Sequence, residues 1–137
     1  MRFAGYAAVF DRPDNGGDVV RPGAFARAAA KGVPLLWQHD PGRPIGVIEQ
    51  VREDAHGLRV IGRLTAGTQA AREAAALLKE HALDGLSFGY RVRASRPGRG
   101  PVKRELIDVD LVEISLVTFP MQRLARVHAL QDSTSEE

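Results

Sequence analysis

The strongest constraint on the fold is a long run of β-forming residues near the C-terminal end of the chain, from Arg104 to Phe119. It is rich in valine and isoleucine, which are enriched in strands because their branched side chains pack well on a pleated surface. Pro120 ends the run, since proline cannot donate to a strand ladder. Strand alternation places Glu113 and Ser115 on one face and Ile114 on the other.

The rest of the chain also reads as mostly strands. Strands are predicted at Met1–Phe10, Val19–Val20, Val33–Gln38, Ile45–Arg52, Leu58–Leu64 and Leu86–Arg93. Helices are predicted at Ala24–Lys31 and Thr68–Ala82, the second with Thr68 as N-cap. Asp40–Pro44 is predicted to be a loop, and 121–130 is either a short helix or a last strand. The fold class is therefore mainly β with helices (α+β), a barrel or curled sheet with antiparallel pairing.

Length and composition limit the organisation of the chain. Its 137 residues fit one domain, which we place at 1–130, followed by a polar and disordered tail at 131–137. There is no apolar run for a membrane span and no signal peptide pattern. The absence of cysteine excludes disulfides, thiolate nucleophiles and cysteine-ligated zinc, and no histidine pattern suggests a metal, so neither metal nor cofactor is expected.

Charge gives little support to a role in nucleic-acid binding. The formal net charge is only +2, whereas dedicated nucleic-acid binders usually carry a strong basic excess. Six basic residues do crowd the segment 91–104, but no aromatic residue lies among them to stack on bases. We interpret this segment as a solvated hairpin loop.

Three polar residues are candidates for chemistry. Glu113 lies inside the most hydrophobic strand and needs a partner, because an unpaired buried charge is costly. His39 ends an apolar strand, and Ser87 lies on a strand between Gly85 and Gly89. A histidine held by a carboxylate is what a serine hydroxyl needs to become a nucleophile, and glycines beside the serine would let a substrate backbone approach. Ser115 is an alternative nucleophile or a hydroxyl in the barrel interior.

Four motifs, in order, resemble the prohead proteases of tailed bacteriophages and phage-like particles. They are GYAAVFDRPDNGGDVVRPGAF from Gly5, LLWQHDPGRPIGV from Leu35, LDGLSFGYRV from Leu83 and LVEISLVTFP from Leu111. The resemblance implies a fold similar to herpesvirus assembly proteases, a closed antiparallel β-barrel ringed by a few helices. It also implies that His39 is the base and Ser87 the nucleophile. Glu113 is placed as the third member of the triad, where related viral proteases use a second histidine.

The resemblance further implies a serine endopeptidase that cuts the scaffolding segment of the capsid protein precursor, and then often itself. It would act inside immature capsids in the bacterial host cytoplasm, and the herpesvirus likeness suggests a homodimer. Two alternatives are a non-enzymatic β-barrel that binds nucleic acid and a structural component of capsid assembly.

Overall fold

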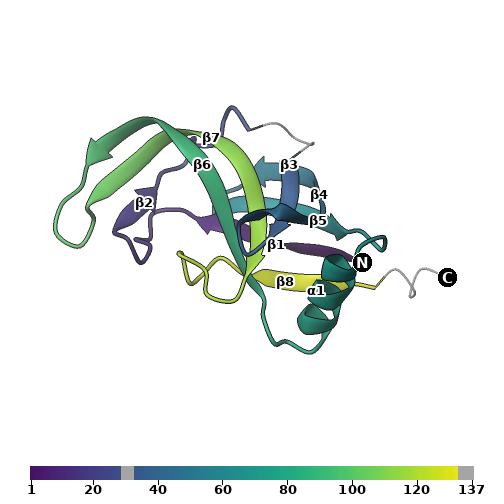
Figure 1. Ribbon diagram of the computed structural model, residues 1–137. Helices are drawn as coiled ribbons and strands as arrows, with labels where there is room; N and C mark the ends of the chain where they lie inside the picture. The colour runs from purple at the N-terminus through teal and green to yellow at the C-terminus, as the bar shows by residue number, and fades with distance from the viewer. Residues whose placement is uncertain (29–32, 133–137) are drawn as a thin grey trace.

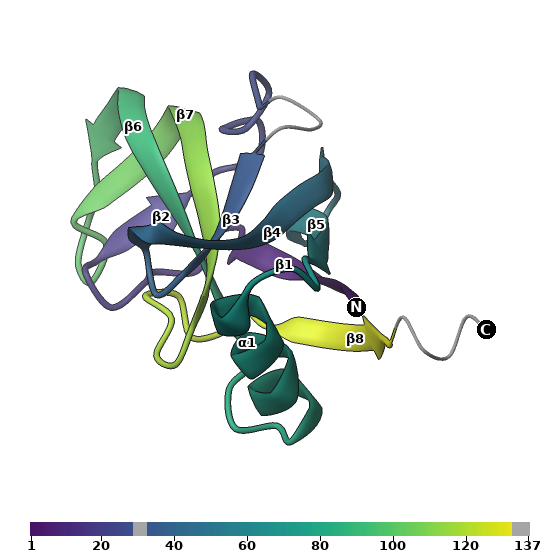
Figure 2. The ribbon, with the colours of Figure 1, turned by 45° about the vertical axis from the view of Figure 1, so that its right-hand side comes forward.

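The computed structural model describes residues 1–28 and 33–132, which form a curled β-sheet with one helix (Figures 1 and 2). The elements are β1 (Arg2–Val9), β2 (Asp18–Val20), β3 (Val33–Trp37), β4 (Asp40–Glu53), β5 (Gly57–Leu64), α1 (Gln69–Lys79), β6 (Gly85–Pro97), β7 (Arg104–Val117) and β8 (Val127–Gln131). The predicted strands and the Thr68–Ala82 helix are thus confirmed in type. The ambiguous segment after Pro120 becomes irregular chain followed by β8.

Strand β7 is the centre of the sheet. The strand order of the sheet is β2-β7-β3-β4-β5-β1-β8. Strands β2 and β3 pair with one edge of β7, and β6 pairs with its other edge. Strands β2 and β3 lie parallel to β7, whereas the remaining pairs are antiparallel. The expected purely antiparallel sheet is therefore wrong, because β3 reaches β7 by a crossover rather than a hairpin.

The sheet curls but does not close into a barrel. Its two ends meet at a single bridge between Gly85 and Arg126, supported by a bond from the Leu86 N–H to the Ala125 carbonyl at 3.0 Å. Beyond Gly85, β6 follows β7 away from the body as a long arm (Figure 1), while β8 ends after five residues. No ladder continues from this bridge between β6 and β8, so the expected closed barrel is corrected to an open half-barrel.

The expected ring of helices is also corrected. Within the described residues α1 is the one α-helix, and the Thr68 side chain caps it by accepting from the Ala71 N–H at 3.1 Å. The described part of the helix expected at Ala24–Lys31 is instead a series of turns, in which the Ala26 N–H bonds to Gly23 and the Ala28 N–H to Phe25. Residues 29–32 lie outside the described residues. None of the helical segments described is long and apolar enough to cross a membrane.

Two further boundaries differ from the sequence prediction. Asp40–Pro44, expected as a loop, begins β4, where Asp40 pairs with Trp37 and Pro44 with Leu36. The register shifts between these pairs, so the prolines occupy an irregular end of the ladder where a missing N–H is tolerated. At the other end of the chain, Gln131 pairs with Arg2 in β8 rather than lying in the tail. Residues 133–137 lie outside the described residues.

Burial explains why β7 organises the core. From Glu113 to Val117 every residue is buried, so this end of the strand is covered on both faces. Ile114 and Leu116 are fully inaccessible to solvent, whereas Val112 is 45% exposed. The pairing of β6 with β7 passes from Gly89–Glu113 directly to Tyr90–Leu111, so Val112 has no partner in the register and forms a β-bulge. Simple alternation along β7 therefore fails beyond Val112.

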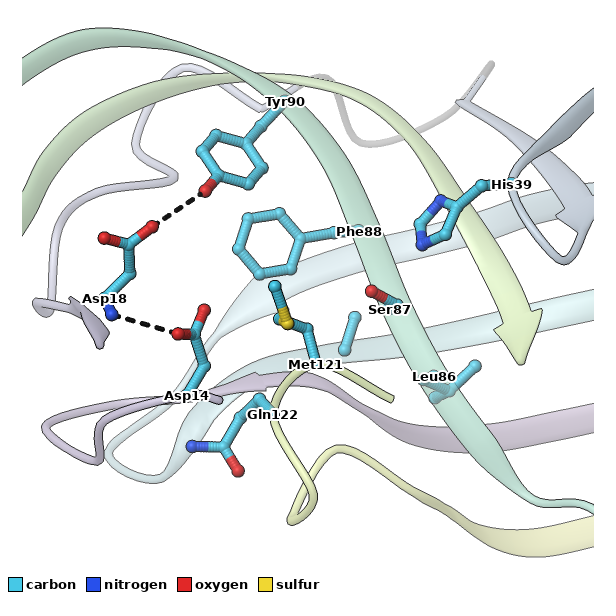
Figure 3. Close-up of a pocket in the computed structure, with 10 residues that line it drawn as sticks. Asp14, Asp18, His39, Leu86, Ser87, Phe88, Tyr90, Met121 and Gln122 are labelled. Carbon is cyan, nitrogen blue, oxygen red and sulfur yellow. Dashed lines mark hydrogen bonds between the residues drawn. The ribbon is translucent and has the colours of Figure 1, made fainter. Parts of the chain in front are cut away.

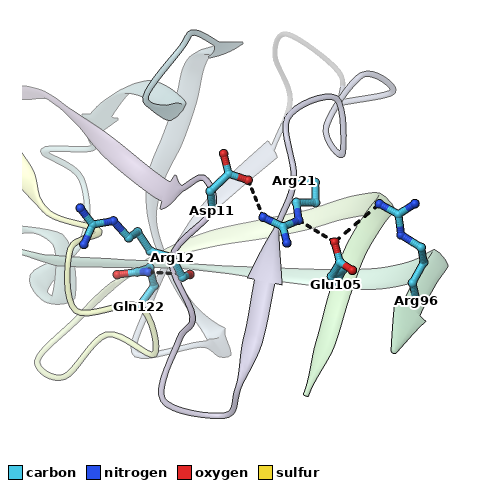
Figure 4. A network of polar contacts seen from close by, with 6 residues as sticks. All are labelled: Asp11, Arg12, Arg21, Arg96, Glu105 and Gln122. Atoms are coloured by element: carbon cyan, nitrogen blue, oxygen red, sulfur yellow. Dashed lines mark hydrogen bonds and ion pairs between the residues drawn. The ribbon is translucent and has the colours of Figure 1, made fainter. Parts of the chain in front are cut away.

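Ion pairs near the outer end of the β6–β7 arm fasten it to the segments around β2 (Figure 4). Arg21 donates to Glu105 at 2.7 Å and to Asp11 at 2.8 Å, and Arg96 lies 3.5 Å from Glu105. The sequence interpretation of the basic segment 91–104 as a solvated hairpin loop is confirmed only in part: residues 91–97 are exposed, but they belong to β6, and Arg104 begins β7. Within this segment Arg93, Arg96 and Arg104 face carboxylates of this same chain.

The difference in burial along β7 predicts a difference in stability. Ile114→Ala should lower the free energy of unfolding by about 2 to 5 kcal/mol, because it leaves a cavity in the core. The control Val112→Ala should cost less than about 1 kcal/mol, because the valine is half exposed at the bulge. Urea denaturation of both variants would measure this, and equal losses would contradict the packing described for β7.

Candidate active site

His39 lies at the tip of a tight hairpin turn between β3 and β4. Trp37 pairs with Asp40, so only Gln38 and His39 form the turn, with φ values of 52° and 60°. Two successive left-handed residues are typical of a type I′ turn, which usually contains Asn or Gly. Keeping larger residues in this conformation costs of the order of 1–3 kcal/mol each, and such strain persists where surrounding contacts hold it.

Those contacts come from β7 and the residues after it. The Gln38 amide donates to the Thr118 hydroxyl at 2.7 Å and accepts from the Thr118 N–H at 3.2 Å. The Gln38 N–H also bonds to the Leu116 carbonyl at 2.9 Å, and the His39 N–H to the Ser115 hydroxyl at 3.1 Å. The turn is therefore held against β7 by both of its residues.

The carboxylate of Glu113 meets the imidazole of His39. Glu113 Oε1 lies 2.5 Å from His39 Nδ1, and Glu113 Oε2 accepts from the Ser115 hydroxyl at 2.6 Å. Glu113 is only 8% exposed, so both oxygens need partners, and they find them in these two residues. The expected pairing of a buried Glu113 with a histidine is what the structure contains.

Gly89 makes room for this carboxylate. It lies opposite Glu113 in the β6–β7 ladder, and a Cβ at position 89 would be 2.4 Å from Glu113 Oε1. Gly85 likewise allows the close approach of the Val117 carbonyl, at 2.6 Å from its would-be Cβ. Both glycines therefore serve close contacts within the protein, and their expected role in admitting a substrate backbone stays a prediction.

Ser87 lies on β6 directly opposite Ser115, and its side chain reaches a pocket of about 220 Å³ that His39 also lines (Figure 3). Figure 3 shows a ring nitrogen of His39 on the side of the ring toward Ser87. Within the described residues no hydrogen bond joins these two side chains. Catalytic hydrogen bonds are often longer in ligand-free enzymes and tighten when substrate binds.

The surroundings of His39 favour the protonated form of its imidazole more than water does for a free histidine. The hydrogen bond to Glu113 raises the pKa of His39, although burial of the ring opposes this. Because Nδ1 is engaged with Glu113, Nε2 is the nitrogen that remains to exchange a proton.

The pocket also contains residues that the sequence analysis did not single out. Asp14 and Asp18 lie across the pocket from Ser87, with the Phe88 ring between the carboxylates and His39, and the Tyr90 hydroxyl donates to Asp18 at 3.4 Å (Figure 3). Asp18 accepts two bonds from Arg104, at 2.8 and 3.1 Å, and burial together with the Asp18 charge raises the pKa of Tyr90. The sequence pointed to Asp14 and Asp18 only as part of a glycine-rich turn.

The segment after β7 forms another wall of the pocket through Met121 and Gln122. Gln122 is buried and donates to the Arg12 carbonyl at 3.2 Å (Figure 4), while the Asn15 N–H bonds to the Met121 carbonyl at 2.9 Å. Two loops distant in sequence are thereby fastened together beside Ser87. No local pattern in the sequence indicated this contact.

Comparison with solved structures shows the fold. The protease of Kaposi's sarcoma-associated herpesvirus, solved with a hexapeptide phosphonate inhibitor, superimposes with a TM-score of 0.67 at 17% identity, covering 96% of this chain and 65% of the viral protein. A second structure of that protease, with an allosteric inhibitor, gives a TM-score of 0.56 at 16% identity, covering 97% of this chain and 77% of the other. The expected herpesvirus-protease-like fold is confirmed, except that the barrel is open and that one α-helix, within the described residues, replaces the expected ring of helices.

Comparison of sequences shows the family. The prohead protease of Enterobacteria phage HK97 is 34% identical over 134 residues, which are 94% of this chain and 60% of that protein. A capsid polyprotein of Pseudomonas phage PAJU2 is 26% identical over 132 residues, 91% of this chain but only 19% of the polyprotein. This chain thus spans less than two thirds of either relative. The family model described as caudovirus prohead serine protease matches residues 1–137, and the chain belongs to that family.

Proposed function

We propose that this chain is a serine endopeptidase that cleaves a capsid protein precursor or its scaffolding segment during head maturation. The observation that carries the proposal is the His39–Glu113 pair beside the pocket that Ser87 lines. It is the set of groups that acyl transfer requires, in a chain of the prohead protease family.

In the proposed reaction Ser87 Oγ attacks the carbonyl carbon of the scissile peptide. His39 Nε2 accepts the hydroxyl proton and then donates it to the leaving amine, which departs as the acyl-enzyme forms. A water molecule then attacks the acyl carbon while His39 Nε2 takes one of its protons. The bond between the acyl carbon and Ser87 Oγ breaks, His39 returns the proton to Ser87 Oγ, and the new carboxyl terminus leaves. Glu113 keeps Nδ1 protonated and stabilises the imidazolium formed on the way.

The shape of the surface suits an extended peptide. A second and broader hollow of about 640 Å³ shares His39 and Tyr90 with the first pocket and has an apolar lining that includes Leu36 and Val112. Because His39 lines both hollows, a peptide bound beside it could place side chains in each. A capsid precursor as substrate is supported by the capsid polyprotein relative, which contains a segment similar to this chain. Action inside immature capsids and a homodimer stay predictions.

Replacement of the proposed nucleophile and base tests the proposal. Ser87→Ala and His39→Ala should each lower cleavage of the capsid precursor by roughly 10⁴-fold or more, because the two groups act as one unit. Ser95→Ala, on the exposed arm of the same strand, serves as control and should cleave normally. Cleavage is followed by gel electrophoresis of the precursor. Labelling with a fluorophosphonate should disappear in Ser87→Ala, fall strongly in His39→Ala, which lacks the base that activates the serine, and persist in Ser95→Ala. A Ser87→Ala protein that still cleaves would refute the assignment.

The pH dependence tests the role of Glu113. Because Glu113 raises the pKa of His39, the neutral base is lost as pH falls through a value above that of an ordinary histidine. Glu113→Gln removes the charge, so the acidic limb of kcat/KM should move to lower pH while the maximal rate falls roughly 10²-fold. The profile is measured with a fluorogenic peptide from the precursor. An acidic limb that does not move would contradict the pairing.

A further inference from the structure

Ser115 is a buried hydroxyl that the proposed reaction does not use. It is completely inaccessible to solvent, near the C-terminal end of β7 and directly opposite Ser87. Its oxygen accepts from the His39 N–H at 3.1 Å, and its hydrogen is donated to Glu113 Oε2 at 2.6 Å. A hydroxyl whose proton is given to a carboxylate and whose oxygen is shielded from solvent cannot attack a peptide.

These hydrogen bonds form a closed ring of three residues, in which Ser115 contacts both Glu113 and His39. The ring passes from Ser115 to Glu113, from Glu113 Oε1 to the His39 imidazole, and from the His39 main chain back to Ser115. We propose, on the basis of the proposed function, that Ser115 is a positioning residue that holds the Glu113 carboxylate and the His39 backbone in one fixed relation.

The physical need for such a residue is clear from the parts it connects. A glutamate side chain has several rotatable bonds, and pinning Oε2 leaves Oε1 directed at Nδ1. His39 has a left-handed backbone conformation, which costs free energy for a residue with a Cβ atom, so its main chain also needs a contact that holds it in place. One hydroxyl meets both needs, and reactive groups must be held to within a fraction of an ångström to act efficiently.

Kinetics of Ser115→Ala test the proposal. The variant should lower kcat roughly 10-fold with little change in KM, because positioning affects the reacting groups and not peptide binding. Ser115→Thr keeps the hydroxyl and should recover most of the rate. In a Glu113→Gln background Ser115→Ala should lower kcat by a smaller factor than in the unmutated protein, because its action through the Glu113 carboxylate has been altered and its bond to the His39 main chain remains. An equal loss in both backgrounds, or a change confined to KM, would overturn the proposal.

A measurement that does not depend on cleavage separates this proposal from the proposed function. In Ser87→Ala protein, proton NMR should detect the His39 Nδ1 hydrogen bonded to Glu113, and additional Ser115→Ala should speed its exchange with water at least about 10-fold. Gln38→Ala is the matched control, because Gln38 anchors the same turn to Thr118 without touching Glu113. Its Nδ1 proton should stay protected.

The NMR and cleavage results distinguish failure of the positioning role from failure of the proposed function. Unchanged exchange in Ser115→Ala, or the same acceleration in Gln38→Ala, would overturn the positioning role even if Ser87 is the nucleophile. Full cleavage by Ser87→Ala would refute the proposed function while leaving the NMR result valid. If Ser115→Ala does not fold, Ser115→Cys is used instead, because a thiol has a similar size but is only a weak hydrogen-bond donor. The His39 Nδ1 proton should then exchange faster with water, as predicted for Ser115→Ala.

Discussion

The buried carboxylate of Glu113 is the constraint on which the site depends. An ionised group at 8% exposure must have its oxygens satisfied, and the protein supplies an imidazole on one and a hydroxyl on the other. Gly89 leaves the space that the carboxylate occupies. Placement of His39 therefore follows from where Glu113 lies, and Glu113 is placed by the strand that carries it.

Strand β7 brings the parts of the site together because two neighbours, β3 and β6, meet it within the same few residues. At Ser115 it pairs with Leu36 of β3 on one edge and with Ser87 of β6 on the other. The histidine turn follows β3 and the serine lies on β6, so both approach the same stretch of β7. Burial of this stretch on both faces gives the site a rigid base, since packed interiors allow little movement.

The open form of the sheet has a consequence for this region. Since β6 has one continuous partner beyond Gly85, the side of the strand away from β7 is left to loops rather than to a further strand. The segments around Asp14 and Met121, tied together by the Asn15 bond to the Met121 carbonyl, occupy that side and form the pocket wall. A closed barrel would have replaced this pocket with a ladder.

Local patterns were sufficient for much of the fold. A run of β-forming residues identified the β7 strand, and a threonine before an alanine-rich periodic segment identified the helix and its cap. The same reasoning failed at Ala24–Lys31 and at Asp40–Pro44. In the first, alanine content suggested a helix, but Glu53 accepts from the N–H groups of Gly23 and Phe25 and favours turns there. In the second, two prolines suggested a loop, but the segment lies at an irregular ladder end.

The sequence by itself determined the type of most elements, the candidates His39, Ser87 and Glu113, and the likeness to a protease family, because these reside in residue type and short-range spacing. Only the tertiary structure decided the strained turn at Gln38 and His39, the opening of the barrel and the partners of Ser115. The bonds from His39 to Glu113 and Ser115 join residues 74 and 76 positions apart. No local propensity encodes such contacts, since they exist only after β3 and β6 have packed on either edge of β7.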